Sequence, residues 1–366
     1  MNLNDFYSII IVGAGPAGIM AARQAAKCGS VLLIDRFKLP RSKSCGGMLN
    51  PYSMRFLKEI GAELPKSAIC EPEKINFRFF DWDRNIRKAT KLEFVNVDRK
   101  IFDEWTLQLL PDNVEIAENM RFISCEQDAA HVYARLQQAD DTKAPEQKIT
   151  CDYLIACDGP RSSVRRCLDV SQLALYKTLQ EFIPYSTGKI EPFFDCIYSR
   201  NIGSDYGYGY IIPKTDYAIV GSVFFPHSKN CASLHEKAIQ VFSEYYPFSN
   251  KRLRREAWSA VLAKSTKDIV GGCGRILLAG EAGGIISPSS GEGISFAMNS
   301  GNLAGLAVCS SKNSEAVLAN YRTSLKPIKR VMAQRLRYFP VLNSNWGKWL
   351  GGSSPNFLVD FVAHRI

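Results

Sequence analysis

The stretch of residues 7–36, YSIIIVGAGPAGIMAARQAAKCGSVLLIDR, constrains the fold of this chain more than any other. Its apolar and glycine spacing predicts a β-strand over residues 7–12, a glycine turn and a helix over residues 16–28. A second apolar run over residues 31–34 predicts another strand, which ends at Asp35. A strand, helix and strand in this order are typical of a parallel α/β sheet.

Each part of this stretch has a physical role in binding a dinucleotide. In the G-x-G-x-x-G turn, Gly13 permits the tight bend, Gly15 lets the backbone approach a pyrophosphate, and Gly18 lets the helix pack on the sheet. The helix N-terminus at Pro16 offers free N–H groups and a partial positive charge to phosphates. Asp35 follows at the distance where a carboxylate accepts hydrogen bonds from a ribose. By itself, this pattern fits NAD as well as FAD.

Length and composition indicate an ordinary globular protein. With 366 residues, 46% of them hydrophobic, the chain has room for two or three domains. We expect no signal peptide and no transmembrane helix, because the first apolar segment lacks a basic leader and no apolar run reaches about 18 residues. The cysteine count of 11 is odd and includes no C-x-x-C pair, so the spacing supports neither a disulfide framework nor a zinc site. No metal is expected, and a reducing cytoplasm is the expected location.

The formal net charge of +10 is concentrated in residues 161–166, 251–255 and 326–337. These clusters could simply solvate the surface, or attract an anionic cofactor or an acidic partner protein. The last cluster alternates with apolar residues, as in a basic amphipathic helix that rests on a membrane, although peripheral membrane contact is not the favoured interpretation. No nucleic-acid-binding motif accompanies the charge, so nucleic acid is not an expected partner.

A second segment resembling a binding site surrounds Asp158 and Gly159. A short apolar strand runs into this Asp-Gly turn, and the basic cluster 161–166 then begins a helix. The alternative interpretation is a surface turn that follows a core strand.

A third such segment follows a short strand over residues 276–279. It contains Gly280, Glu281 and a glycine-rich loop that opens an apolar helix over residues 294–308. Such a loop lets backbone amides approach a flat ring closely, and the helix N-terminus can polarise the electron-poor edge of that ring. A glycine-rich loop without a ligand is the alternative.

Together the three segments resemble the flavin-binding motifs of the aromatic-hydroxylase class of FAD enzymes. The motifs GAGPAG, CDG and GEAGG…PSSGEGI occur in the order found in that class, which includes the geranylgeranyl-reductase-like proteins and the flavin-dependent halogenases. The resemblance spans most of the chain. It is strongest to the enterobacterial CbrA-type flavoproteins. The overall organisation is also similar to that of the LodB- and GoxB-type flavoproteins, which mature tryptophylquinone-containing amine oxidases.

Further segments agree with this resemblance. Residues 43–47, KSCGG, resemble the C-G-G turn of the geranylgeranyl-reductase branch. Residues 98–105 resemble the D-R-x-x-F-D-x-W/L segment, whose Arg reaches the FAD phosphate region. Residues 208–216 resemble the Y-x-W-x-F-P-K strand and turn that line the isoalloxazine ring.

The resemblance implies FAD as the cofactor and assigns roles to matching positions. The first glycine turn and its acid are expected to hold the ADP half, and Arg99 and Asp158 to flank the pyrophosphate and ribitol. Glu281 departs from the Asp common at its position, although its longer carboxylate should still reach a ribitol oxygen. The expected FAD-binding residues are Gly13, Gly15, Pro16, Ala17, Gly18, Asp35, Arg36, Cys45, Gly46, Gly47, Arg99, Asp158, Gly159, Gly280, Glu281, Gly291, Gly293 and Ile294.

The predicted architecture is α/β, with a discontinuous Rossmann-like FAD domain and an α+β substrate part. Period-two alternation over residues 193–198 and 217–224 predicts antiparallel strands in the substrate part. One helix is predicted over residues 314–338, followed by a Trp-containing closing segment. The expected boundaries are 1–70, 96–170 and 265–310 for the FAD domain, 71–95 and 171–264 for the substrate sheet, and 311–366 for the C-terminal helical segment.

No side chain here supplies redox chemistry, so the cofactor must carry it. Hydroxylation of an aromatic group is the leading interpretation, and the group could belong to a small molecule or to a tryptophan of a partner protein during quinone-cofactor maturation. Prenyl double-bond reduction is the first alternative, favoured by the C-G-G turn. Halogenation is disfavoured, because Tyr208 and Tyr210 replace the tryptophans of the halogenase W-x-W strand. Lys74, which is expected just before a strand, does not have the setting of the catalytic halogenase lysine.

The proposed substrate end contains Cys45, Tyr208 and Tyr210 as candidate catalytic residues. Neighbouring Lys43 and Arg41 favour a thiolate at Cys45. The alternative, equally consistent with the sequence, is that Cys45 is simply a small residue tolerated in a tight turn. The tyrosines that could form a flat amphipathic wall for an apolar or aromatic substrate are Tyr176, Tyr185, Tyr198, Tyr206, Tyr208 and Tyr210.

The source of electrons is open. The chain has no second G-x-G-x-x-G turn, so either NAD(P)H binds transiently or a separate reductase delivers the electrons. A further alternative is a non-catalytic flavoprotein that acts as a maturation partner, with its basic tail bound to an acidic protein.

Overall fold

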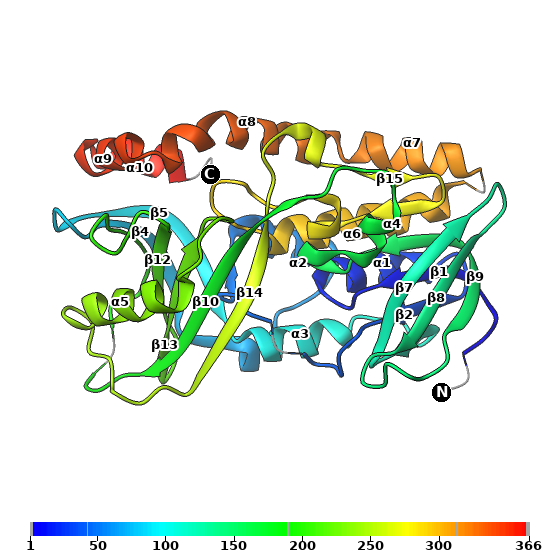
Figure 1. Cartoon of the computed structure of the whole chain (residues 1–366), viewed down its shortest axis with the longest axis horizontal. Helices are drawn as coiled ribbons and strands as arrows, with labels where there is room; N and C mark the ends of the chain where they lie inside the picture. The colour runs from blue at the N-terminus through cyan, green and yellow to red at the C-terminus, as the bar shows by residue number, and fades with distance from the viewer. Residues whose placement is uncertain (1–2, 42, 189, 312, 364–366) are drawn as a thin grey trace. The chain divides into compact units, whose positions relative to one another are not determined.

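The computed structural model describes residues 3–41, 43–188, 190–311 and 313–363 (Figure 1). The chain forms two compact units, each built from three separate stretches. Unit 1 consists of Met1–Arg41, Asp103–Leu173 and Val261–Gln334, and unit 2 of Ser42–Phe102, Ala174–Ala260 and Arg335–Ile366. Residues 42–70 and 96–102 therefore group with unit 2. The functional domain boundaries expected from the sequence stay a prediction, because a compact unit need not coincide with a functional domain.

Unit 1 is built on a mostly parallel sheet with the strand order β15-β16-β9-β1-β2-β6. The pairs β16–β9, β9–β1, β1–β2 and β2–β6 are all parallel, and the β7–β8 hairpin joins β9 through an antiparallel pair. The strands are β1 (Phe6–Val12), β2 (Val31–Ile34), β6 (Val114–Ala117), β7 (Met120–Gln127), β8 (Val132–Gln138), β9 (Gln147–Ala156), β15 (Gly272–Cys273) and β16 (Ile276–Leu278).

Both faces of this sheet are buried, which explains why its strands are nearly continuous apolar runs. Along β1, Ile9 and Ile11 face a core that includes small residues of α1 (Pro16–Ala25) and α6 (Ile294–Ser310). Ile10 and Val12 face the opposite core, which includes Val164 of α4 (Ser163–Cys167) and residues of the β7–β8 hairpin. This arrangement confirms the predicted α/β, Rossmann-like fold.

The sequence prediction of one helix over residues 314–338 is wrong. The structure has two helices there, α7 (Ser314–Ser324) and α8 (Lys326–Asn343), and Leu325 separates them. Pro327 lies in the first turn of α8. Because proline lacks an N–H group and crowds the residue before it, a new helix begins near it and the preceding one does not continue.

The expectation that the cysteines form no disulfide framework also needs a correction. Cys28, just after α1, and Cys309, on α6, form a disulfide with their Cα atoms 5.5 Å apart. The two positions are 281 residues apart, so no local spacing motif indicates the pair. The close packing of α1 on α6 brings them together.

Unit 2 is built on an 8-stranded sheet with the order β14-β10-β13-β12-β11-β4-β5-β3. Apart from the parallel β11–β4 pair, the described pairs are antiparallel. This confirms the predicted antiparallel sheet. The strands are β3 (Met48–Leu49), β4 (Ile69–Asp81), β5 (Ile86–Val97), β10 (Ala174–Pro184), β11 (Phe193–Tyr198), β12 (Tyr206–Pro213), β13 (Tyr217–Phe224) and β14 (Arg254–Leu262).

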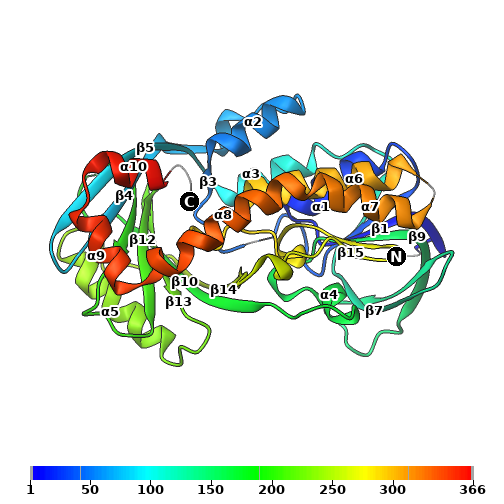
Figure 2. The same cartoon turned by 90° about the horizontal axis from the view of Figure 1, so that it is seen from above.

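Helices cover parts of this sheet. Helix α5 (Cys231–Ser243) packs on one face through Ala238, Ile239 and Phe242, and α9 (Asn345–Ser353) and α10 (Asn356–Ala363) contact β4 and β5 (Figure 2). The remaining helices are α2 (Pro51–Glu59) and α3 (Arg99–Leu107). Among the described residues, the search for a helix with the length and hydropathy of a membrane span finds none.

Candidate functional site

The glycine turn of unit 1 joins β1 to α1, as the sequence predicts. Gly13 has φ +100°, and a Cβ there would lie 2.5 Å from the Cys157 carbonyl oxygen. A Cβ on Gly18 would lie 1.8 Å from the Gly13 carbonyl oxygen, so the first turn of α1 packs directly on the loop. Gly15 is different, because the nearest atom to its Cβ would be the side-chain Nη2 of Arg41, at 3.0 Å. A ligand can therefore approach the backbone at Gly15, with a movable side chain in the way.

The acid at the end of β2 points toward this turn. Asp35 is buried, and its Oδ2 accepts a hydrogen bond from the Ala14 N–H at 2.9 Å. The same oxygen forms an ion pair with Arg41 Nε at 3.3 Å. The Nη1 of Arg41 is buried and has no hydrogen-bond partner in the described part of the chain. A guanidinium with a spare donor beside a glycine turn fits an anionic phosphate.

The neighbours of Asp35 and Gly15 are placed as follows. Pro16 and Ala17 are buried in the first turn of α1, directly after its N-cap Gly15. Arg36 is exposed and its guanidinium lies 4.7 Å from the centroid of the Phe37 ring, a cation–π contact. Its expected role in binding the cofactor stays a prediction.

The three motifs meet at one edge of the parallel sheet. They follow β1, β9 and β16, which are neighbours in the order β16-β9-β1-β2, and Asp35 follows β2. Hydrogen bonds continue past the strand ends, from Cys157 N to Val12 O at 2.7 Å and from Ala279 N to Ala156 O at 2.9 Å. Since the carboxyl ends of parallel strands share one edge, Gly13, Asp158 and Gly280 lie at the edge where such sheets bind nucleotides.

Asp158 has one engaged and one spare carboxylate oxygen. Its Oδ2 accepts hydrogen bonds from Ser163 N at 2.6 Å and Val164 N at 3.3 Å at the start of α4. Its Oδ1 is buried without a hydrogen-bond partner among the described residues, and burial raises the pKa of the carboxyl group. Gly159 has φ +78° and open space where its Cβ would be. A ligand hydroxyl that donates to Oδ1 would satisfy the spare acceptor.

Arg165 links the second motif to the third, a role that the sequence prediction missed. Its guanidinium donates to the carbonyl oxygens of Ala282 at 2.9 Å, Asp268 at 3.1 Å and Ser171 at 2.9 Å. The sequence showed Arg165 only as one member of a basic cluster, because two of its three partners are backbone groups more than 100 residues away. Arg165 holds the turn of the third motif against α4.

The third motif forms a tight turn and then begins a helix. Gly280 has φ +55°, and the Oε2 of Glu281 accepts a hydrogen bond from Val261 N at 3.1 Å. Gly291 has φ +66°, Gly293 is the N-cap of α6, and Ile294 is the first residue of that helix. The helix thus starts where the sequence predicts. The expected contacts of Glu281 with ribitol and of this loop with the flavin ring stay predictions.

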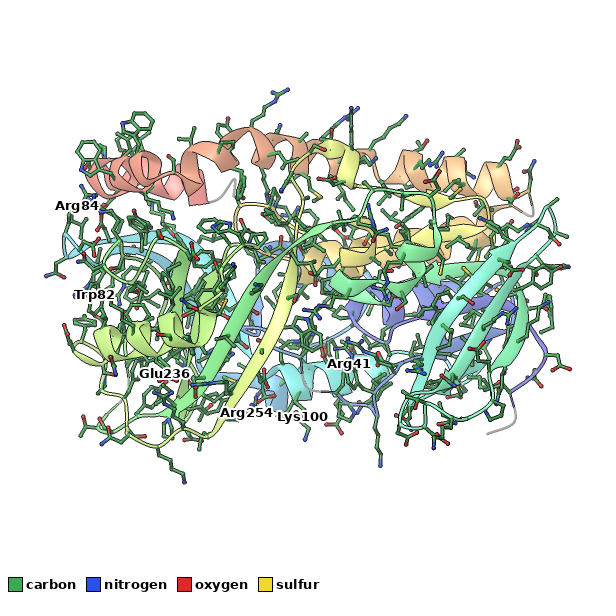
Figure 3. The ribbon with its side chains drawn as sticks, viewed as in Figure 1. Arg41, Trp82, Arg84, Lys100, Glu236 and Arg254 are labelled. Atoms are coloured by element: carbon green, nitrogen blue, oxygen red, sulfur yellow. A yellow bond between two sulfur atoms is a disulfide. The ribbon has the colours of Figure 1, made fainter. Side chains whose placement is uncertain are left out.

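In unit 2, Cys45 and Arg99 line the same small pocket, which is partly open to solvent. The pocket is strongly basic. Its charged lining consists of Lys43, Arg99, Lys100, Lys214 and Arg254, with Asp98 as the acid. Figure 3 labels two of these residues, Lys100 and Arg254. Asp98 accepts hydrogen bonds from the backbone of α3, so its charge is partly used to cap that helix. An excess of cations in a pocket favours an anionic ligand group.

Lys214 is the most deeply buried of these cations. Its Nζ donates to Asn96 Oδ1 at 2.6 Å and to Val97 O at 2.7 Å, and lies 3.5 Å from Gly47 O. It therefore joins the C-G-G turn to the end of β5, just before Arg99. Burial lowers the pKa of Lys214 to about 8, while the oxygen atoms around Nζ stabilise the ammonium. The sequence showed Lys214 only as the last residue of the tyrosine-strand motif.

The glycines of the C-G-G turn are needed for packing within unit 2. A Cβ on Gly46 would lie 2.4 Å from Ile212 Cδ1, and one on Gly47 would lie 2.1 Å from Val97 O at a backbone φ of +63°. Packing therefore explains both glycines whether or not a cofactor contacts them. Cys45 is half-buried in the pocket wall. Its thiolate character stays a prediction.

The tyrosines do not form the single wall that the sequence suggested. Tyr206 faces α5 and packs with Phe242, and Tyr185 donates its hydroxyl to the carbonyl oxygens of Lys214 and Tyr217. A Cβ on Gly209 would touch Tyr206 and Phe242, so Gly209 faces α5 as well. The correction has a physical cause: a register shift between residues 206 and 208 turns Tyr206 to the other face.

Tyr208 and Tyr210 remain together, with ring centroids 6.4 Å apart. Tyr210 lies over Gly221, where any side chain would collide with its ring. Gln180 Nε2 donates to the Tyr210 hydroxyl at 2.7 Å, and Ser44 Oγ donates to Gln180 Oε1 at 2.5 Å. Burial raises the pKa of both tyrosines, which keeps the phenols neutral.

Two other sequence predictions concern lysine and metal. Lys74 lies inside β4 and not before a strand, and its exposed ammonium forms an ion pair with Glu93 at 2.9 Å. Among the described residues, the search for groups of His, Cys, Asp and Glu that could hold a metal ion finds none.

Comparison with known proteins agrees with this geometry. A family model described as an FAD binding domain matches residues 7–183. Protein CbrA of Escherichia coli (strain K12) is 30% identical over 303 residues, which cover 81% of this chain and 82% of that protein. The chain belongs to the CbrA family of FAD-binding proteins. Protein CbrA of Shigella dysenteriae serotype 1 (strain Sd197) is 29% identical over 358 residues, 94% of this chain and 96% of that protein.

The fold of this CbrA-family chain also occurs in solved flavoproteins and related enzymes. A geranylgeranyl bacteriochlorophyll reductase-like protein from Thermoplasma acidophilum aligns with a TM-score of 0.78 and 18% identity over 98% of this chain and 91% of that one. The anhydrotetracycline hydroxylase OxyS of Streptomyces rimosus aligns with a TM-score of 0.68 and 18% identity over 98% of this chain and 73% of that one. The flavin-dependent brominase Bmp2 aligns with a TM-score of 0.73 and 17% identity over 98% of this chain and 93% of that one. At this identity the likeness shows a shared fold.

FAD is the cofactor of this CbrA-family protein. The unit 1 residues fit the cofactor on their own geometry. The spare Arg41 donor suits a phosphate, the approach at Gly15 suits a pyrophosphate, and the spare Asp158 acceptor suits a hydroxyl. Flavin monooxygenases as a class draw electrons from NAD(P)H or from a separate reductase.

Proposed function

We propose that the protein is an FAD-dependent monooxygenase that hydroxylates an aromatic group. The observation that carries the proposal is the pair Tyr208 and Tyr210, two neutral phenols on one face of the unit 2 sheet. The two rings are inclined by 48° and offer aromatic faces with polar hydroxyl edges, which suit another aromatic ring. Ser44 and Gln180 fix the orientation of Tyr210 through hydrogen bonds.

The residues around this pair have distinct roles in the proposal. Phe194 lies 6.4 Å from Tyr210, centroid to centroid, and belongs with Ile212 and Ile219 to an apolar cluster that excludes water. The cations of the unit 2 pocket attract an anionic group of the substrate or cofactor. When bound, reduced FAD supplies the electrons that activate O₂ for hydroxylation. Cys45 is proposed as a further residue of the substrate end.

The substrate class extends in the proposal to a tryptophan of a partner protein during quinone-cofactor maturation. The similarity of the chain's organisation to the LodB- and GoxB-type flavoproteins supports this extension. A cytoplasmic location, expected from the cysteine pattern, completes the proposal.

Reduction of a prenyl double bond is the second candidate. The C-G-G turn at Cys45–Gly47 favours it, and so does the shared fold with the geranylgeranyl bacteriochlorophyll reductase-like protein. The two reactions differ in their use of oxygen, because hydroxylation consumes O₂ and alkene reduction proceeds without it.

The first experiment measures O₂ uptake by the FAD-loaded protein with NADH or NADPH, with and without a panel of aromatic acids and tryptophan-containing peptides. A reductase is added in a parallel series to supply electrons. Hydroxylation predicts uptake that rises with one substrate and matches the hydroxylated product formed. Uptake that yields only hydrogen peroxide with every substrate contradicts the proposal.

The same protein, kept anaerobic with a reductant and a prenyl alcohol or prenyl phosphate, tests the second candidate through loss of the alkene. A further series with bromide and O₂ tests halogenation, because a brominase shares the fold. A protein that binds FAD yet turns over in none of these assays would favour the non-catalytic maturation role.

A further inference from the structure

The helices at the C-terminal end of unit 2 expose an unusual set of large apolar side chains. Trp346 is 64% exposed and Phe357 is 69% exposed, although such residues are normally buried. We call this set the C-terminal aromatic surface. It consists of Tyr338, Val341, Trp346, Trp349, Phe357 and Leu358, all exposed, on α8, α9 and α10.

The exposed residues follow the period of their helices. On α9, Trp346 and Trp349 are three positions apart and share the outer side of the helix. At the end of α8, Tyr338 and Val341 have the same spacing. Both views of the structure show α9 and α10 side by side (Figures 1 and 2). The apolar groups are therefore displayed as sets on helix faces, a pattern typical of an interaction surface.

The inner side of α9 is held by cations, which leaves the tryptophans outside. Lys348 donates to Gly207 O at 3.2 Å and lies 4.5 Å from the centroid of the Tyr198 ring. Arg84 donates to Trp349 O at 2.9 Å and to Ser353 Oγ at 3.0 Å (Figure 3). These contacts fix the helix backbone on unit 2, so the exposure of Trp346 and Trp349 follows from the packing of α9.

The sequence that forms most of this surface is strongly basic. From Lys326 to Val359 the sequence contains no Asp or Glu. Arg337 is exposed on α8, next to Tyr338 of the surface. The guanidinium of Arg84 lies 5.6 Å from the centroid of the Trp349 ring. The surface therefore combines an excess of cations with tryptophan, tyrosine and phenylalanine, although Asp81 pairs with Arg84 at 2.7 Å and α10 contains Asp360.

We propose that the C-terminal aromatic surface binds the anionic face of a lipid bilayer, with α8, α9 and α10 lying on the membrane. Tryptophan and tyrosine favour the boundary between headgroups and acyl chains, and arginines beside them attract anionic headgroups. An acidic partner protein would match the charge as well. The bilayer is favoured because the most exposed side chains, Trp346 and Phe357, are large aromatic groups beside cations, a combination typical of helices that lie at a membrane interface.

The test is flotation of the full-length FAD-loaded protein with vesicles of phosphatidylcholine alone or mixed with phosphatidylglycerol. We expect binding to the mixed vesicles that weakens as salt rises, and little binding to the neutral ones. The double variant Trp346→Ser/Trp349→Ser should lose binding to the mixed vesicles. Arg337→Gln should weaken it by roughly fivefold.

Helix α2 supplies a matched control, because Tyr52 is 56% exposed there and Arg55 is also exposed. The variant Tyr52→Ser/Arg55→Gln removes the same kinds of group and should bind vesicles like the wild type. Flavin content and the thermal midpoint check that each variant is folded.

Several outcomes would overturn the proposal. They are equal binding to neutral and anionic vesicles, no binding to either, and retention of binding in the tryptophan variant. Binding to polyglutamate in solution without binding to vesicles would also overturn it, and would assign the surface to an acidic protein instead.

Discussion

The glycine turn of unit 1 and the basic pocket of unit 2 are built in opposite ways. At the turn, the backbone forms the site, and Gly13 and Gly18 are required because a side chain would strike a main-chain oxygen. In the pocket, side chains from segments far apart in sequence form the site, with Lys214 as the buried link. A site made by backbone has a local sequence signature. A site made by distant side chains has none until the sheet is assembled.

The largest effect is expected from two substitutions in the turn, Gly18→Val and Gly15→Val, which test whether each glycine serves the fold or the cofactor. Valine at Gly18 meets backbone at 1.8 Å and should lower the free energy of unfolding by at least about 3 kcal/mol. Gly15 has φ −82° and ψ −178°, which any residue adopts, and only the Arg41 side chain is near. Gly15→Val should therefore keep the fold and weaken FAD binding by about a hundredfold or more.

Urea unfolding of the apo proteins and FAD titration separate the two effects. If Gly15→Val retains FAD as tightly as the wild type, the pyrophosphate does not approach the backbone there.

The second prediction concerns acid, which should act on the side-chain core of unit 2. His235 is fully buried, its Nδ1 lies 2.8 Å from Ser222 Oγ, and burial with nearby Arg255 lowers its pKa to about 4 from an ordinary 6.5. The unfolded chain therefore binds the extra proton between about pH 6.5 and pH 4, and the protein loses up to about 3 kcal/mol of stability as the pH falls through this window.

Urea unfolding at neutral pH and at about pH 5 measures this loss. The variant His235→Gln should show a flatter dependence, because glutamine does not titrate. An equal slope in variant and wild type would show that other groups carry the acid sensitivity.

The third prediction sharpens the role of side chains in the pocket. Lys214→Met should lower the free energy of unfolding by about 2 kcal/mol, because Asn96 Oδ1 and Val97 O lose a charged donor in a buried site. Lys100→Met is the control, since exposed Lys100 lines the same pocket and its loss should change stability by less than about 0.5 kcal/mol. Equal effects of the two variants, measured by urea unfolding, would assign the loss to charge alone.

The smallest effect on stability is expected at the tyrosine pair. Tyr210→Phe removes the acceptor of the Gln180 hydrogen bond and should cost about 1 kcal/mol. If Tyr210 orients the substrate, product formation should fall by about tenfold at unchanged flavin content. Tyr185→Phe also loses buried hydrogen bonds but lies outside the pair, so its turnover per folded protein should stay normal. Equal turnover in both variants would remove Tyr210 from the substrate site.

Much of the fold could be predicted because its elements carry local patterns. The strands β2, β11 and β13 have the bounds expected from their apolar runs, and α6 starts at Ile294 as expected. The prediction failed where a local pattern continued across a break. The amphipathic period runs through Leu325, yet α7 ends before it and α8 begins with Pro327 in its first turn.

The site shows the same limit. The three motifs can be assigned to one ligand through their resemblance to the flavin-binding motifs of FAD enzymes, and the parallel order of β1, β9 and β16 places them at one edge of the sheet. Arg165 and Lys214 could not be predicted, because their partners are mostly backbone carbonyl oxygens, which leave no trace in the sequence. The separation of Tyr206 from Tyr208 and Tyr210 depends on a register shift that alternation does not reveal.

The sequence by itself determined the α/β fold, the dinucleotide turn and, through the resemblance, FAD as the cofactor. These properties depend on residue types at short spacings, where sterics and strand period act directly. The tertiary structure decided the Cys28–Cys309 disulfide, the environment of Lys214, the facing of the tyrosines and the exposure of Trp346 and Trp349. Each of these depends on which distant segments pack together, because burial and hydrogen bonding are properties of the assembled core.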